Sequence, residues 1–156
     1  TFAMCAEMCL ALGMSPQQIV QNAARIIQTP HRMQVTNCGF YVVDDGYNAS
    51  LSGVESSCKT LSKFGGKKCA VAQGIVEGGR QSRQLNAQCG KMLGETFDEV
   101  VVVGPNRHAL EEGLLATNTL VLHANSLAEA TEIVRKNLSH GDILYYQNDI
   151  PDLPVT

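Results

Sequence analysis

The chain has 156 residues, a mass of 16.8 kDa and a formal net charge of -3, and this length fits one globular domain. Hydrophobic residues make up 44% of the chain, charged residues make up 17%, and the mean hydropathy is -0.04, which excludes a disordered protein. The longest apolar runs, Val100 to Val103 and Leu114 to Ala116, are far too short to span a bilayer. The acidic balance, with no basic block, argues against a nucleic-acid partner. We therefore expect neither membrane insertion nor nucleic-acid binding.

Two helices are expected at the start of the chain. Residues 1–12 are rich in Ala, Met and Leu, and Gly13 supplies a C-terminal stop. Ser15 then fits a helix cap, and Gln18 stands where the partner of a capping box belongs. We expect the second helix to continue as far as Pro30.

A hairpin and an alternation of helices and strands follow. Residues 33–36 and 40–43 are β-prone, and Asn37-Cys38-Gly39 between them suits a hairpin turn. Beyond the hairpin, helices are expected at 53–64, 82–93, 107–115 and 126–138, and strands at 68–72, 99–103, 118–122 and 142–146. Strands separated by helices predict right-handed crossovers and parallel pairing. The expected fold is an α/β, Rossmann-like three-layer domain with a mostly parallel sheet of about six strands and one antiparallel edge strand from the hairpin.

Six cysteines are scattered along the chain, and none belongs to a Cys-x-x-Cys pair: Cys5, Cys9, Cys38, Cys58, Cys69 and Cys89. No histidine stands at zinc-finger spacing from them, so we expect no metal site. Scattered cysteines in a chain of this length are typical small buried hydrophobes of a reducing compartment. The residues before Ser15 lack the basic flank and cleavage site of a signal peptide. We expect a cytoplasmic protein.

Three polar loops follow predicted strands, and ligands in such sheets bind at the carboxyl ends of the strands. Residues 44–50 hold two carboxylates, a phenol and an amide. Residues 73–80 run from a strand into a helix but contain neither a Gly-Lys-Ser/Thr triplet nor a G-x-G-x-x-G pattern. Residues 103–108 end in Arg107 and His108, which can meet an anion at a helix start. Structural alternatives stay open: turns and caps in the first loop, a tight turn in the second and a solvated helix turn in the third.

These segments together resemble the C-terminal domain of the Mur ligases, the ATP-dependent family that builds the peptide of the peptidoglycan precursor. The resemblance is strongest to the members that add D-alanyl-D-alanine. Residues 44–50 resemble the family's Asp-Asp-x-Tyr-Asn-Ala-Asn-Pro motif, residues 74–79 resemble Gly-Met/Leu-x-Glu-Leu-Gly, and residues 31–33 resemble Gly-Arg-Met. The chain has His31 in place of the family's glycine, and Gln147 lies where a Lys-Gly-Ser-like segment is expected.

The resemblance implies a C-terminal domain that closes over ATP in a larger enzyme. Residues 1–30 would be a helical lead-in from a central domain, and residues 31–156 the glutamate-ligase-like domain. By motif, Arg32 and Asp45 are expected to contact the nucleotide. A carboxylate suits ribose hydroxyls, and a guanidinium suits an anion or a stacked base. The incoming amino acid or dipeptide is expected near the loops that carry Tyr47, Asn48, Glu77 and Arg107.

The implied reaction joins a UDP-linked muramyl peptide to an amino acid or dipeptide through an acyl phosphate, with ATP and Mg²⁺ held mostly by the central domain. The protein would contribute positioning and charge stabilisation. We expect no catalytic and no metal-binding residue in this chain, so the chain alone is expected to be inactive. Two alternatives remain: a divergent Mur-like ligase with another acceptor, and a non-catalytic module that binds a nucleotide or a partner protein.

Overall fold

The structure of the protein, a computed structural model, describes residues 2–27 and 29–147. Thr1 of the expected first helix and residues 148–156 of the expected second domain lie outside this part. Its elements, in chain order, are α1 (Phe2–Ala11), α2 (Pro16–Ala23), β1 (Gln34–Asn37), β2 (Tyr41–Asp45), α3 (Leu51–Leu61), β3 (Lys68–Ala72), the short 3₁₀ helix η1 (Gly79–Gln81), α4 (Ser82–Thr96), β4 (Glu99–Val102), α5 (Arg107–Leu114), β5 (Leu120–His123), α6 (Leu127–Arg135) and β6 (Ile143–Gln147).

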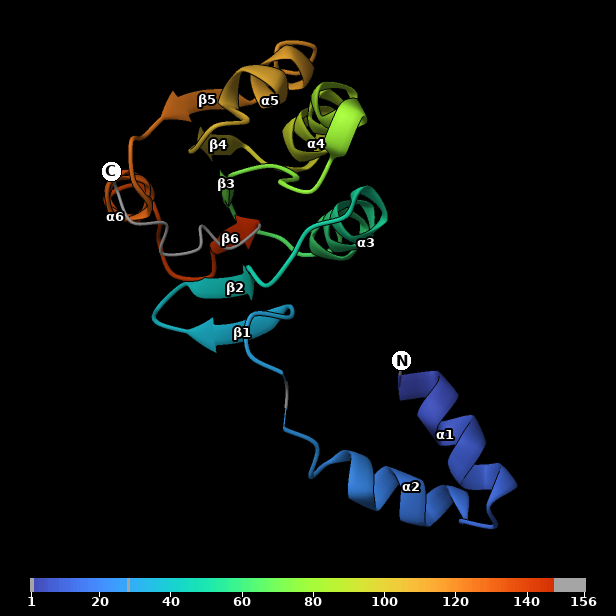
Figure 1. The fold of residues 1–156 in the computed structure, drawn as a ribbon. Helices are drawn as coiled ribbons and strands as arrows, with labels where there is room; N and C mark the ends of the chain where they lie inside the picture. Colours follow the sequence, from blue (N-terminus) through green and yellow to red (C-terminus); the bar gives the residue numbers. More distant parts are fainter. Residues whose placement is uncertain (1, 28, 148–156) are drawn as a thin grey trace.

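The centre of the molecule is a six-stranded sheet with the order β1-β2-β6-β3-β4-β5 (Figure 1). β1 pairs antiparallel with β2 through the predicted hairpin, and every other neighbouring pair is parallel. The expected α/β class and the antiparallel edge strand are both confirmed. Each parallel connection carries a helix, because a parallel strand has to return to the same end of the sheet before it can pair.

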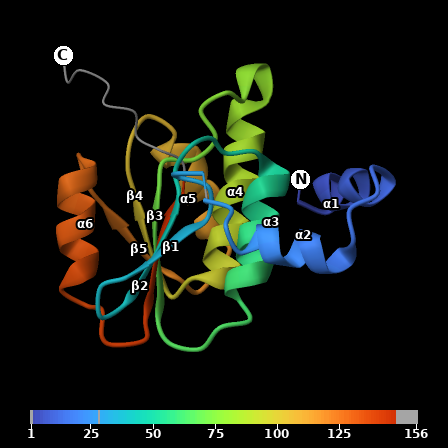
Figure 2. The same ribbon diagram turned by 90° about the horizontal axis from the view of Figure 1, so that it is seen from below.

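The sheet is covered unequally on its two faces. Helices α3, α4 and α5 lie along one face and α6 lies alone on the other, which both views show (Figures 1 and 2). Side chains alternate along each strand, so Val100 and Val102 pack on the three-helix side, whereas Val101 and Val103 pack toward α6. The result is a three-layer domain with two apolar cores.

Helices α4 and α5 pack closely because glycines stand at their contact. A Cβ atom at Gly90 would overlap the carbonyl oxygen of Leu110, and one at Gly113 would overlap that of Ala87. Only glycine leaves room for backbones to approach this closely, and the start of α5 is thereby held beside α4.

The predicted cap of α2 is confirmed, but the predicted end of this helix is wrong. Ser15 and Gln18 form the predicted capping box at α2. This helix ends at Ala23 instead of continuing to Pro30. After Ala23 the chain makes a tighter turn, in which the Ile26 amide donates a hydrogen bond to the Ala23 carbonyl. α2 buries no residue, so little packing is present to extend it beyond Ala23.

Helices α1 and α2 lie apart from the sheet in both views (Figures 1 and 2). Neither helix contains a buried residue. Large apolar side chains are exposed along this segment: Phe2, Met4, Met8, Leu10, Leu12, Val20, Ile26 and Ile27. Within residues 2–27 and 29–147, no helix has the length and apolar character needed to cross a membrane.

The expectation of buried cysteines holds for half of them. Cys58, Cys69 and Cys89 are buried, whereas Cys5 and Cys38 are exposed. All six cysteines are free thiols. Burial raises the pKa of both the Cys69 and the Cys89 thiol to about 12, so these two groups stay protonated and serve as packing residues.

The polar loops leave the sheet at one edge. Asp45 at the end of β2 pairs in register with Gln147 of β6, Gln147 pairs with Ala72 of β3, and Ala72 pairs with Val102 of β4. The carboxyl ends of four parallel strands therefore lie side by side. We call this the carboxyl edge, and it is where the three predicted loops begin.

Candidate functional site

Asp45 is the best-anchored side chain of the first loop. Its Oδ1 accepts a hydrogen bond from the Met33 amide at 3.2 Å. Its Oδ2 accepts two hydroxyl hydrogen bonds, from Ser57 of α3 at 2.9 Å and from Tyr145 of β6 at 3.1 Å. Three donors from separate elements therefore fix a half-buried carboxylate at the carboxyl edge.

Asp45 does not cap the next helix, which was its structural alternative. The N-cap of α3 is Ser50, whose hydroxyl accepts from the Gly53 amide. The neighbouring Asp44 does serve the turn, because its Oδ1 accepts from the Gly46 amide at 3.0 Å. The capping and turn roles thus fall to Ser50 and Asp44, whereas Asp45 bonds to the Met33 amide and to the hydroxyls of Ser57 and Tyr145.

Arg32 and Tyr47 are in contact, although Arg32 is expected from the sequence to contact the nucleotide and Tyr47 to lie near the acceptor. The Arg32 guanidinium carbon lies 4.2 Å from the centre of the Tyr47 ring, a cation–π geometry. The Tyr47 amide also donates to the carbonyl of His31 at 3.0 Å, which ties this loop to the segment before β1. Tyr47 is 62% exposed, so much of this side chain is available to a ligand.

The backbone around Arg32 has an unusual conformation. His31 and Met33 have φ angles of 59° and 50°, in the left-handed region that favours glycine. The Mur ligase pattern has glycine at the position of His31, which this geometry explains. Here the His31 Nδ1 lies 2.8 Å from Asp44 Oδ2, and this contact helps to hold the strained residue in place.

The second loop, between β3 and α4, is held by buried amide side chains. Gln147 accepts from the Gly74 amide at 2.9 Å and donates to its carbonyl at 3.3 Å. Asn86 of α4 accepts from the Ile75 amide at 2.7 Å and donates to its carbonyl at 3.0 Å, and Asn106 donates to the same carbonyl at 3.3 Å. The start of this loop is therefore rigid, and it is joined to the third loop.

The remaining predicted residues lie on the surface of these loops. Asn48 is exposed between β2 and α3, and Glu77 is exposed in the β3–α4 loop. Arg107 is exposed as the first residue of α5. All three lie in connections at the carboxyl edge.

Sequence reasoning missed Ser57 and Tyr145, the two hydroxyl donors to Asp45. They are 12 and 100 residues from it in sequence. The available signal was weak: a tyrosine in an otherwise apolar strand, whose hydroxyl needs a partner once it is buried. Burial, followed by the Asp45 charge, raises the pKa of the Tyr145 phenol, so Tyr145 remains a donor at physiological pH.

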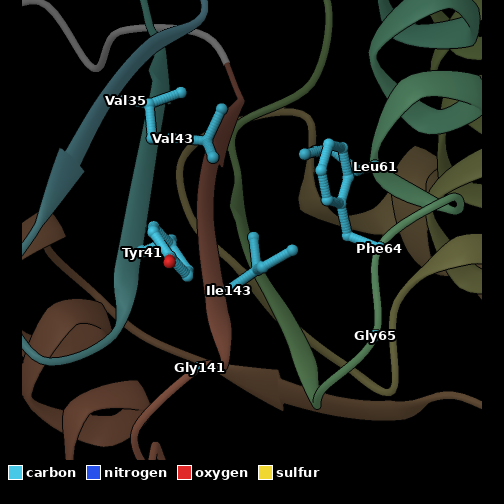
Figure 3. A pocket seen from close by; sticks show the side chains of 8 residues that line it. All are labelled: Val35, Tyr41, Val43, Leu61, Phe64, Gly65, Gly141 and Ile143. Atoms are coloured by element: carbon cyan, nitrogen blue, oxygen red, sulfur yellow. The ribbon is translucent and has the colours of Figure 1, made fainter.

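An apolar groove lies away from these residues. A groove of about 420 Å³ opens beside the end of α3, and Val35, Tyr41, Phe64 and Ile143 are among its lining residues (Figure 3). Tyr41 and Ile143 are the first residues of β2 and β6, so the groove lies toward the opposite edge of the sheet from Asp45. Its walls are mainly apolar.

The described residues contain no group of three or more His, Cys, Asp or Glu side chains that could hold a metal ion. The carboxylates of Asp44, Asp45 and Glu77 at the carboxyl edge do not gather into such a group, so they do not fit a metal centre.

Comparison with known proteins agrees with the topology. The family described as Mur ligase, glutamate ligase domain, matches residues 31–146. The crystal structure of the MurF ligase from Thermotoga maritima in complex with ADP has a TM-score of 0.78 at 23% identity, covering 91% of this chain and 32% of that chain. A crystal structure of MurF from Acinetobacter baumannii has a TM-score of 0.76 at 24% identity, covering 90% of this chain and 32% of that chain.

A protein with a different name also shares the fold. The bifunctional folylpolyglutamate synthase/dihydrofolate synthase from Yersinia pestis, complexed with AMPPNP and Mn ion, has a TM-score of 0.66 at 16% identity, covering 87% of this chain and 32% of that chain. At these identities the solved structures establish the fold alone, and the chain spans about a third of the length of each. The family match extends over most of the chain, from before β1 into β6, so this chain belongs to the Mur ligase family through its glutamate ligase domain.

Proposed function

We propose that this chain is the C-terminal domain of an ATP-dependent ligase that forms an amide bond in peptidoglycan precursor synthesis. In this role the domain closes over a nucleotide held by a central domain and receives the incoming amino acid or dipeptide. The acyl donor is a UDP-linked muramyl peptide, and the enzyme works in the cytoplasm. Residues 1–30 are the lead-in from the central domain, and residues 31–156 form the closing domain.

The observation that supports this most is the anchored carboxylate of Asp45. Three protein donors hold it at the edge of the sheet where α/β domains bind ligands. A fixed carboxylate suits the vicinal hydroxyls of a ribose, because it accepts hydrogen bonds without first losing side-chain freedom. Asp45 therefore binds the ribose of ATP.

Arg32 is the second nucleotide residue. Its guanidinium lies against the Tyr47 ring, which restricts its rotamers, and a planar cation suits a phosphate or a base. The same contact brings Tyr47, which we assign to the acceptor side, next to the nucleotide side. We propose that Tyr47 separates the two subsites.

The acceptor side includes Asn48, Glu77 and Arg107. Glu77 lies in a loop whose base is fixed by buried amides, and it suits the ammonium group of an amino acid or dipeptide. Arg107 opens α5, where a guanidinium and a helix N-terminus together favour a carboxylate. Mg²⁺ and the phosphates would be held by the central domain, since the described residues of this chain do not suit a metal.

A ligase with another acceptor is the main alternative. It is supported by the likeness of this fold to a folylpolyglutamate synthase/dihydrofolate synthase, whose name indicates a different product. The other alternative, a non-catalytic module, predicts nucleotide or partner binding without turnover. The proposed function and both alternatives place the ligand at the carboxyl edge.

The test is a ligase assay on the full-length protein that contains this chain. ADP release is measured with ATP, Mg²⁺, a UDP-linked muramyl peptide and a panel of acceptors that includes D-alanyl-D-alanine. Release that requires both the muramyl peptide and an acceptor from the panel supports the proposal. Release only with another acyl donor or acceptor supports the divergent ligase, and nucleotide binding without release supports the binding module. The 156-residue chain alone is expected to turn over no ATP.

A further inference from the structure

The carboxylate of Asp45 is nearly saturated by the protein itself. A carboxylate has about four acceptor positions, two on each oxygen. Oδ2 receives the hydroxyls of Ser57 and Tyr145, which fill both of its positions. Oδ1 receives the Met33 amide, which fills one. Among the described contacts, one position therefore remains, and it is on Oδ1.

The two hydroxyl donors are built into the core. Ser57 is 4% exposed and Tyr145 is 1% exposed. The Tyr145 ring stacks on Phe97, with the ring centres 5.3 Å apart and an angle of 11° between the planes. Both donors come from packed elements, α3 and β6, so neither hydroxyl can move away from Asp45 without disturbing the core.

We propose that Ser57 and Tyr145 are positioning residues that occupy Asp45 Oδ2 and leave Oδ1 to accept a single ribose hydroxyl. This inference rests on the proposed nucleotide role of Asp45 and sharpens it. A free carboxylate could accept both vicinal hydroxyls, one on each oxygen. The Asp45 carboxylate of this chain accepts a hydrogen bond from only one of the two hydroxyls.

The count of acceptor positions is tested with ribose analogues. The affinity of the full-length protein for ATP, 2′-deoxy-ATP and 3′-deoxy-ATP is measured by titration calorimetry. One deoxy analogue is expected to bind roughly 10- to 150-fold more weakly than ATP, as for loss of a hydrogen bond to a charged group, and the other about as well as ATP. Asp45→Asn is expected to remove the difference between the two analogues.

Two variants test the positioning. Tyr145→Phe and Ser57→Ala each delete one oxygen and keep the packing volume nearly unchanged. Each is expected to lower ATP affinity roughly 3- to 10-fold, as for one lost hydrogen bond, and to leave affinity for the sensitive deoxy analogue unchanged. A merely structural role would lower the affinities for all three nucleotides together.

Matched controls stand next to both residues. Tyr146→Phe also removes a phenol from β6, but that hydroxyl pairs with Thr131 at 2.9 Å on the α6 side. Ser56→Ala removes an exposed hydroxyl one position before Ser57. Both controls are expected to bind all three nucleotides as the wild type does, and melting temperatures report the folding of each variant.

The outcomes separate this inference from the proposed function. If Asp45→Asn lowers ATP affinity but the wild type binds both deoxy analogues equally weakly, the inferred number of free acceptor positions on Asp45 is wrong, while its nucleotide role stands. If Tyr145→Phe and Ser57→Ala behave like their controls, the positioning role is wrong. If the wild type binds no ATP, or Asp45→Asn binds it like the wild type, the nucleotide role itself fails and the inference falls with it.

Discussion

The two edges of the sheet carry similar polar side chains and use them differently. The amino ends of the parallel strands form the opposite edge, which we call the amino edge. There the Lys67 ammonium pairs with Glu99 at 2.9 Å, and Asp142 accepts from the amides of Lys67 and Ser139. At the carboxyl edge, Asp45 is anchored but keeps an acceptor position, and Tyr47 remains exposed.

The difference shows how to separate structural from functional polar groups in this fold. Carboxylates at the amino edge join loops to strands; Asp98, for example, accepts from the Lys68 amide at 2.8 Å. Residue type alone does not distinguish them from Asp45. What distinguishes Asp45 is its place at the carboxyl ends of parallel strands, where α/β domains bind ligands.

The largest expected effect is on stability, at the amino edge. The Glu99 side chain is 1% exposed, and it pairs with Lys67, whose side chain is 36% exposed. Lys67→Met leaves a buried charge uncompensated, which costs about 3 kcal/mol, near the low end for such pairs because water reaches Lys67. Denaturant unfolding measures the loss, and Lys63→Met, at an exposed position, is the control. Nucleotide affinity should stay unchanged, and a change would contradict the division between the edges.

The same pair predicts a pH dependence. The hydrogen bond to Glu99 raises the pKa of Lys67 above its ordinary value of 10.5. Because the folded-state pKa is the higher one, the stabilisation is complete below the unfolded-state value and is lost as the pH rises through the folded-state value. The free-energy difference between wild type and Lys67→Met should therefore be constant at neutral pH and shrink above about pH 10.5. A difference that stays constant above that pH would contradict this.

The next largest effect is on nucleotide binding, at the carboxyl edge. Asp45→Asn removes a charge-assisted hydrogen bond to ribose worth about 1.5 to 3 kcal/mol, or roughly 10- to 150-fold in ATP affinity. The asparagine keeps one acceptor oxygen for the protein donors, so unfolding should change by only about 1 kcal/mol.

The matched control for Asp45→Asn is Asp98→Asn at the amino edge. The Michaelis constant for ATP of the full-length protein is compared for the two variants. Asp98→Asn should leave it unchanged, because Asp98 lies at the other end of the strands. An unchanged constant for Asp45→Asn would remove Asp45 from the nucleotide site.

Much of this fold could be predicted, because its strands and helices have strong local patterns. The apolar run at residues 100–103 and the capping box at Ser15 each depend on neighbours within a few residues. The end of α2 could not be predicted, since it depends on what packs against the helix, and α2 buries nothing. Helix periodicity says nothing about whether a partner is present.

The site was predictable only in part for a similar reason. The motif at residues 44–50 singled out Asp45, but its donors Ser57 and Tyr145 are brought to it by tertiary packing. The contact between Arg32 and Tyr47 accompanies left-handed backbone at His31, which no local pattern indicated in a residue other than glycine. Motifs locate such a site, and packing determines its geometry.

A smaller effect is expected in the β3–α4 loop. Asn86→Ala leaves the buried amide and carbonyl of Ile75 without their 2.7 and 3.0 Å partners, although Asn106 still reaches the carbonyl. Loss of stability should be about 2 kcal/mol, which denaturant unfolding measures. Gln88→Ala, at an exposed position of the same helix, should cost little. Equal losses for the two variants would show that Asn86 does not anchor the loop.

The smallest expected effect separates the two proposed subsites of the carboxyl edge. Arg107 is exposed at the start of α5, so its attraction for the carboxylate of an acceptor is screened by water. Exposed ion pairs contribute up to about 1 kcal/mol, so Arg107→Ala should raise the Michaelis constant of the acceptor roughly 2- to 5-fold. The constant for ATP should not change, because Asp45 and Arg32 remain. Arg83→Ala serves as the control, since Arg83 is an exposed arginine already paired with Glu112 on α5. If Arg107→Ala raises the Michaelis constants for ATP and for the acceptor equally, the two proposed subsites are one site. If it changes neither constant, the acceptor carboxylate binds elsewhere along the carboxyl edge.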